Sequence, residues 1–118
     1  MSESPEFVVI FSTVPSQEVG GNIARELVRE RLAACVNLVP GLTSIYEWKG
    51  KLEEESEVLL IVKTTHGKAE PAIKRIIELH PYEVPEAIVL PILDGHPAYL
   101  DWIQSETSLP PLKEGSQP

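Results

Sequence analysis

Residues 31–64 read RLAACVNLVPGLTSIYEWKGKLEEESEVLLIVKT and predict a long antiparallel hairpin. Strand-forming residues run over 33–49, and Pro40-Gly41 within them predicts a bulge, because proline cannot donate a hydrogen bond to a strand ladder. A turn and a glutamate-rich stretch follow, and residues 58–64 then form an apolar return strand. This stretch therefore supplies two neighbouring strands of a sheet.

The segments on either side of the hairpin alternate between strand and helix patterns. Before the hairpin, apolar spacing and turn residues predict a strand over 7–11 and a helix from Ser16 to about Leu32. After it, they predict a helix that has Pro71 in its first turn and that Pro81 stops. A strand over 87–93 and a short helix from Pro97 follow. The order is that of a ferredoxin-like α+β sandwich, β-α-β-β-α-β, with an extra C-terminal helix. In that topology Pro40 and Pro91 fall in edge strands, where a sheet tolerates proline.

The length of 118 residues predicts one domain, because it leaves no room for two independent cores. We place this domain at residues 1–107. From Ser108 the chain has three prolines and no apolar period, so residues 108–118 are expected to form a flexible tail.

Charge and composition argue against several classes of partner. The net charge of −8 repels phosphate backbones and anionic lipids, and residues 58–63 lack the aromatic side chains on which RNA-binding sheets stack bases. The N-terminal segment is acidic, and its apolar run stops at Phe11, too early for a signal peptide or a membrane span. We therefore expect a cytoplasmic protein that binds neither nucleic acid nor membranes.

The predicted strands are apolar on both faces, as in FVVIF at 7–11 and VLLIV at 58–62. Two helices can cover only one face of a four-stranded sheet, so the other face would expose a large apolar patch. Self-association is the economical way to bury it, although this reasoning gives no number of subunits.

Three strings together resemble the CutA divalent-cation-tolerance family: STVPS at 12–16, the hairpin sequence at 31–64, and HPYEVPE at 80–86. The resemblance extends over roughly residues 7–102. It implies a ferredoxin-like homotrimer with ligand clefts between subunits, and a role in tolerance of copper and other divalent cations without a settled reaction. No cofactor is required by this reading.

The string His80-Pro81-Tyr82-Glu83 carries the strongest metal-binding chemistry in the chain. An imidazole suits copper or zinc and a carboxylate can complete a mixed site, so His80 and Glu83 are the candidate metal ligands. The alternative is that His80 favours the helix C-terminus and Pro81 only stops the helix. Two ligands need a third from elsewhere in the trimer.

The resemblance also implies a ligand cleft between subunits. The residues that match it are Asn37, Tyr46, Trp48, Lys63, Tyr82 and Trp102. The aromatic members have an alternative role as packing anchors at an interface. Lys63 stands in an apolar strand and needs a carboxylate partner, an anionic ligand or a route to solvent.

Two further features bear on metal chemistry. Cys35 is the only cysteine and lies among apolar neighbours, which predicts a buried structural residue. Some bacterial members of the family carry a copper-associated cysteine where this chain has Ser12, so thiolate coordination is not expected. The glutamates within 53–57 could gather divalent cations weakly, but such a run is usually a solvated turn.

The sequence favours a binding protein that takes a divalent cation or a small anionic ligand at trimer interfaces. No catalytic motif is present, so an enzyme is not expected. Two alternatives stay open: a scaffold or signalling trimer without a metal function, and an enzyme that uses His80 or Glu83 as acid or base.

Overall fold

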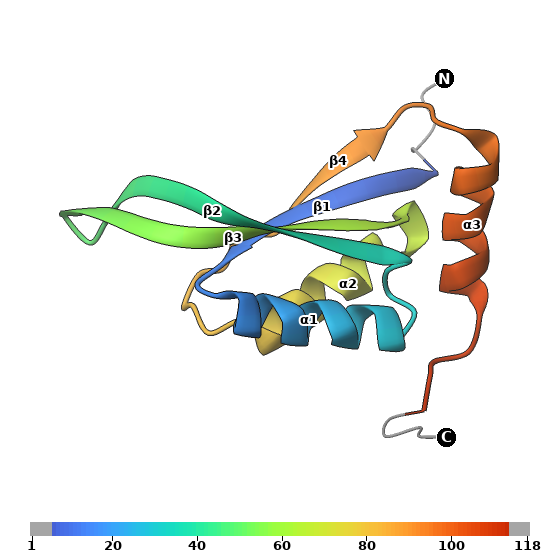
Figure 1. Ribbon diagram of the computed structural model, residues 1–118, viewed down its shortest axis with the longest axis horizontal. Coiled ribbons are helices and arrows are strands. Elements are labelled where there is room, and N and C mark those ends of the chain that lie inside the picture. Colours follow the sequence, from blue (N-terminus) through green and yellow to red (C-terminus); the bar gives the residue numbers. More distant parts are fainter. Residues whose placement is uncertain (1–5, 114–118) are drawn as a thin grey trace.

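The computed structural model describes residues 6–113: a twisted sheet, two helices against one of its faces and a third helix at one end (Figure 1). The elements are β1 (Phe7–Val14), α1 (Gln17–Arg29), β2 (Cys35–Trp48), β3 (Lys51–Thr65), α2 (His66–Leu79), β4 (Ile88–Ile92) and α3 (Pro97–Ser108). This order confirms the predicted ferredoxin-like α+β fold with an extra C-terminal helix.

The sheet is antiparallel throughout, in the order β2-β3-β1-β4. Pro40 and Pro91 lie in the edge strands β2 and β4, as predicted, because an edge can leave a missing N–H facing away from the ladder. The register of β2 against β3 shifts between Val39 and Leu42, which confirms the predicted bulge. Gly41 adopts a φ of +87° within this bulge.

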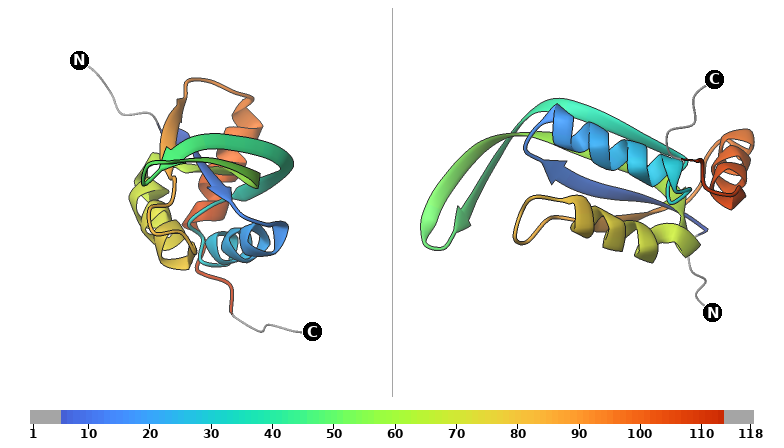
Figure 2. Two further views of the ribbon diagram at one scale, coloured as in Figure 1. Left: turned by 90° about the vertical axis from the view of Figure 1, so that its left-hand side faces the viewer. Right: turned by 90° about the horizontal axis from the view of Figure 1, so that it is seen from below.

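The hairpin is longer than the sequence predicts, because the glutamate-rich segment continues β3 instead of forming a solvated turn. Residues 53–57 pair in register with β2, and the turn needs only Lys49 and Gly50. Both turn residues have positive φ, 52° and 81°, as a tight two-residue hairpin turn requires. Pairing across the strands overrides the weak strand preference of glutamate. The outer half of the hairpin projects beyond β1 (Figures 1 and 2).

Helix α2 begins at His66, directly after β3, so Pro71 does not lie in its first turn as predicted. The reason is visible in its buried face: Ala69, Ala72 and Ile76 follow helical spacing that starts before the proline. Pro71 therefore lies inside the helix, where it removes the hydrogen bond that an N–H at this position would donate to the carbonyl of Gly67. The helix ends before Pro81, as predicted.

Helix α1 begins as predicted, with Ser16 as its cap. The Ser16 side chain accepts a hydrogen bond from the Val19 N–H at 3.2 Å, and the helix ends at Arg29, three residues before the predicted end.

The core lies between the sheet and the two helices. Its buried members are Ile10, Val14, Ile23, Leu27, Ala33, Val58, Leu60, Val62, Ala72 and Ile76.

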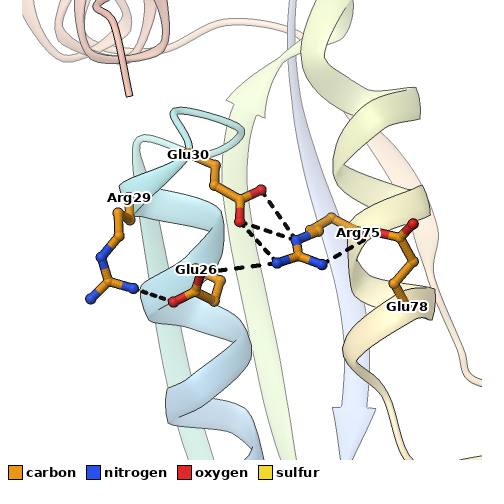
Figure 3. A network of polar contacts seen from close by, with 5 residues as sticks. All are labelled: Glu26, Arg29, Glu30, Arg75 and Glu78. Atoms are coloured by element: carbon orange, nitrogen blue, oxygen red, sulfur yellow. Dashed lines mark hydrogen bonds and ion pairs between the residues drawn. The ribbon is translucent and has the colours of Figure 1, made fainter. Parts of the chain in front are cut away.

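A charged network joins the outer sides of α1 and α2 (Figure 3). The Arg75 guanidinium lies 3.1 Å from Glu30 and 3.4 Å from Glu78, and it reaches Glu26 at 4.0 Å. Glu26 is also paired with Arg29. Because these side chains are partly exposed, each pair contributes little alone, but together they hold the two helices in one layer.

The face of the sheet opposite the helices is apolar and largely uncovered. Along β1, Val8 and Ile10 are fully buried against the helices, whereas Val9 and Phe11 on the other face are only half-buried. Register pairing extends this uncovered face across the sheet through Val39, Leu59, Ile61, Ile88 and Leu90. We call these seven residues the open face.

The segment after α3 runs back along the molecule. The Leu112 N–H donates to the Arg29 carbonyl at 2.8 Å, and the Arg31 side chain donates to the Pro110 carbonyl at 3.1 Å. The flexible tail that the sequence predicts over 108–118 stays a prediction, and residues 114–118 lie outside the described part of the chain.

Candidate functional site

An acidic cleft of about 670 Å³ lies between the projecting hairpin and the loop that joins α2 to β4. Its volume is in the range of small-ligand sites. Five carboxylates and three aromatic rings line it: Glu53, Glu55, Glu57, Glu83, Glu86, Tyr46, Trp48 and Tyr82. We call this feature the acidic cleft.

Strand geometry explains why three of the carboxylates gather there. Glu53, Glu55 and Glu57 alternate along β3, so their side chains leave the same face of the strand. Their neighbours across the ladder include Tyr46, opposite Glu53, and Ser44, opposite Glu55, and both also line the cleft. The hairpin therefore presents a row of carboxylates with an aromatic neighbour.

Glu57 is the most buried of these carboxylates, with only 4% of its surface exposed. Its Oε2 accepts a hydrogen bond from the Tyr82 hydroxyl at 2.6 Å. Burial, followed by this hydrogen bond and the negative charge of Glu57, raises the pKa of Tyr82 above its ordinary value. Within residues 6–113, Glu57 has no ion pair and its Oε1 has no hydrogen bond.

His80 is buried behind the cleft, and both of its ring nitrogens are engaged. Nε2 lies 2.8 Å from the Thr13 carbonyl, to which it donates, and Nδ1 accepts from the Tyr82 N–H at 3.2 Å. These partners define a neutral imidazole with its proton on Nε2. The ring also packs against Tyr82 at a centroid distance of 4.7 Å. His80 therefore positions Tyr82 and has no free lone pair for a metal ion in this arrangement.

Glu83 lies at the rim of the cleft, apart from His80. Its side chain is mostly exposed, and its Oε1 lies 3.6 Å from the Lys49 ammonium at the hairpin turn. The same ammonium lies 5.6 Å from the centroid of the Trp48 ring. Among residues 6–113 no three side chains of His, Cys, Asp or Glu stand close enough to hold one metal ion. The two predicted metal ligands thus do not form a site by themselves.

The six predicted cleft residues fall into two groups. Tyr46, Trp48 and Tyr82 line the acidic cleft, whereas Asn37, Lys63 and Trp102 do not. The Lys63 ammonium lies 5.7 Å from the ring of Tyr99 on α3, and that ring packs on Trp102 at 5.5 Å.

The two groups are far apart because Lys63 and Glu53 are ten positions apart along β3, about 33 Å at 3.3 Å per residue. Opposite Lys63 in the ladder, Cys35 is half-buried on the uncovered side of the sheet, not in the core as predicted.

Sequence reasoning raised the glutamates within 53–57 as weak cation ligands but took the run for a solvated turn, and it did not single out Glu86. The pattern E-x-E-x-E over 53–57 is a signal for one acidic strand face, but it reads as a turn until the strand is known to extend that far. No sequence pattern marks Glu86 as a cleft residue. Its Oε1 accepts a hydrogen bond from the Thr13 hydroxyl at 3.3 Å, and the two residues are 73 positions apart in the chain.

Comparisons with known proteins agree on one family. The family described as CutA1 divalent ion tolerance protein matches residues 8–106. A divalent-cation tolerance protein CutA from Thermus thermophilus is 54% identical over 99 residues, covering 84% of this chain and 96% of that protein. A chloroplastic protein CutA from Arabidopsis thaliana is 45% identical over 90% of this chain and 58% of its own longer sequence.

Solved structures agree with the sequence comparisons. The crystal structure of CutA from Xylella fastidiosa aligns with a TM-score of 0.85 at 45% identity, covering 86% of this chain and 98% of that one. The fold, the matched residues 8–106 and the level of sequence identity all indicate the same family. The chain belongs to the CutA1 divalent ion tolerance protein family.

Proposed function

We propose that this chain acts in divalent-cation tolerance as a homotrimer that binds a divalent cation in its acidic cleft. The observation that carries the proposal is the convergence of five carboxylates on one cleft. Glu57 in particular is a buried negative charge without a cationic partner among the described residues. Carboxylate oxygen is the ligand that hard divalent cations prefer, and a buried charge is stabilised by a counter-ion.

The open face supports the trimeric part of the proposal, because apolar surface of this extent is normally covered by another subunit. The separation of the two groups of predicted cleft residues points in the same direction. One subunit cannot bring Lys63 and Trp102 to the acidic cleft, but a neighbouring copy in a closed ring could present them there.

Because no three side chains of His, Cys, Asp or Glu meet around one point within residues 6–113, we assign the metal contacts to two hairpin carboxylates, Glu55 and Glu57, completed by water or by groups of a neighbour. His80 then acts as a positioning residue that holds Tyr82 against Glu57, instead of as a ligand. At such an oxygen site copper should bind more tightly than manganese, because divalent affinities follow a general order at a given set of ligands.

Titration calorimetry of metal-stripped protein with copper and manganese tests this proposal. Glu57→Gln should weaken binding of both ions about tenfold, because it removes one charge and keeps an acceptor for Tyr82. Glu70→Gln is the matched control, since Glu70 is an exposed carboxylate on α2 outside the cleft. Equal affinities for wild type and Glu57→Gln, with the trimer mass unchanged, would refute the site.

The dependence of copper affinity on pH separates the carboxylate site from the histidine site. If His80 coordinates copper, protons compete with the metal for its imidazole, so affinity should already fall under mildly acidic conditions. A site made only of carboxylates should keep its affinity to lower pH, because carboxylates are weaker bases than imidazole. We expect the second result.

We further propose a cytoplasmic location and no catalysed reaction. No helix in residues 6–113 is long and apolar enough to cross a membrane. Some relatives have another location, such as the chloroplastic protein of Arabidopsis thaliana. Cell fractionation is therefore the measurement that tests the location. The enzyme alternative would use His80 or Glu83 as acid or base. Both ring nitrogens of His80 already have partners within the chain, and Glu83 is exposed and paired with Lys49.

A further inference from the structure

The spacing of charges in the acidic cleft differs from that of a site for a single metal ion. Glu53, Glu55 and Glu57 leave β3 at every second residue, a repeat of about 6.6 Å along the strand. No three metal-ligating side chains within residues 6–113 meet around one point. The negative charge is therefore spread along the cleft, and it matches a ligand whose positive charges are also separated.

Glu57 adds a second observation that points to a cationic ligand. Only 4% of the surface of this residue is exposed, and the residue lines the cleft. One oxygen accepts from the Tyr82 hydroxyl, while the other has no hydrogen bond to any described residue and is not sealed from solvent. A donor entering the cleft would satisfy that oxygen and offset the buried charge.

The aromatic lining favours an organic cation over a bare metal ion. Tyr46, Trp48 and Tyr82 present ring surface beside the carboxylates. Alkylammonium groups are attracted to aromatic faces, and their methylene chains pack on rings, which a hydrated metal ion cannot do.

The chain itself shows this recognition at the rim of the cleft. The ammonium of Lys49 lies 5.6 Å from the Trp48 ring centroid and 3.6 Å from the Glu83 carboxylate. A primary ammonium on a flexible methylene chain is thus already held by one ring and one carboxylate that line the cleft. The deeper carboxylates offer the same chemistry, with no ammonium from residues 6–113 of the same subunit paired with Glu57.

We propose that the acidic cleft binds a linear aliphatic polyamine, a chain of ammonium groups separated by three or four methylenes. The inference rests on the proposed function in one respect, that this cleft is a cation site. It adds the class of ligand: one ammonium lies against Glu57, a second lies along the row of Glu55 and Glu53, and the methylenes pack on Trp48 and Tyr46.

The test is titration of the assembled protein with spermidine, with butylamine as a singly charged comparison. Spermidine should bind at least a hundredfold more tightly than butylamine. Glu57→Gln should weaken spermidine binding about tenfold, whereas the control Glu70→Gln should change it less than twofold. If spermidine and butylamine bind alike, or if both variants weaken spermidine equally, the cleft does not recognise separated charges and the proposal is overturned.

A second variant separates this inference from the metal proposal. Trp48→Leu removes the ring and keeps every carboxylate, so it should weaken spermidine binding several-fold more than it weakens manganese binding, with the mass of the assembly checked. Manganese binding without spermidine binding would overturn the polyamine inference alone. Spermidine binding that depends on Glu57, without binding of manganese or copper, would support this inference and overturn the metal proposal.

Discussion

Ser12 is fully buried on the helix-facing side of β1, and its hydroxyl has no hydrogen-bond partner among the described residues. A buried donor without a partner costs about 1–3 kcal/mol. We therefore expect Ser12→Ala to raise the free energy of unfolding by about 1 kcal/mol, measured by urea denaturation.

Thr64 is the matched control, because it is equally buried and its hydroxyl donates to the Leu32 carbonyl at 2.7 Å. Thr64→Val should lower the free energy of unfolding by about 1 kcal/mol, since it leaves that carbonyl without its partner. A loss of stability in Ser12→Ala as well would mean that the Ser12 hydroxyl is satisfied in solution, and the prediction would be wrong.

The hydrogen bond from Tyr82 to Glu57 predicts a dependence of stability on alkaline pH. The pKa of Tyr82 is raised in the folded protein, first by burial and then by Glu57, while in the unfolded chain it is about 10. Because the unfolded chain releases this proton first, the contribution to stability is complete below about pH 10 and falls as pH rises above it.

The variant Tyr82→Phe tests this contribution. Near pH 8 it should be less stable than wild type by about 1.5–3 kcal/mol, because the buried Glu57 loses its donor. Its stability should then fall less steeply than that of wild type between about pH 10 and pH 12. Parallel pH profiles for the two proteins would show that Tyr82 does not report on Glu57.

The role of His80 could not be settled from the sequence, although both readings of it were available there. Position at a helix end and the following Pro81 favoured a helix stop, and residue chemistry favoured a metal ligand. The contact that occupies its Nε2 is with Thr13, which is 67 residues away in the chain. Local patterns carry no information on such a partner, so only the fold brings it into the argument.

At the scale of elements, two glycines predict opposite responses to the same substitution. Gly41 in the bulge has a φ of +87°, where a Cβ is strained by about 1–2 kcal/mol whatever the space around it. Gly67 lies in the first turn of α2, with an ordinary φ and no atom within 4 Å of an added Cβ.

We expect Gly41→Ala to lower the free energy of unfolding by about 1 kcal/mol, and Gly67→Ala to raise it by about 0.5 kcal/mol. Guanidinium denaturation of both variants beside wild type checks the pair. Two changes of the same sign would contradict the assigned conformations, because the side-chain change is identical and only the backbone differs.

The elements that the sequence predicted well are those fixed by local chemistry. Ser16 caps α1, the bulge follows Pro40, and Pro91 lies in an edge strand, because each depends on a property of one or two residues. The elements that it misjudged depend on pairing: β3 extends back through residues 53–57 because β2 lies beside it. For this reason the sequence analysis took the glutamates within 53–57 for a solvated turn, although it raised them as weak cation ligands.

At the scale of the molecule, the two-faced apolar strands could be predicted, and the uncovered open face agrees with them. Strand alternation and the two-helix topology suffice for that step, since neither needs the position of a single side chain. The number of subunits has no such local origin. It enters only through the family resemblance, so it requires a measurement of its own.

Leu90 offers that measurement, because it is exposed on β4 and belongs to the open face, opposite Val9. If three copies bury this face against one another, Leu90→Glu places an unpaired carboxylate in each contact, at a cost of several kcal/mol per subunit. We expect light scattering coupled to size exclusion to give the trimer mass for wild type and about one third of it for the variant.

The control for this prediction is Ile77→Glu, since Ile77 is also an exposed apolar residue, on α2. Ile77 lies on the helix layer, away from the open face, so the same change of charge there should leave the trimer intact. A folded Leu90→Glu protein that keeps the trimer mass would show that the open face is not the contact, and the hairpin would then be the surface to test.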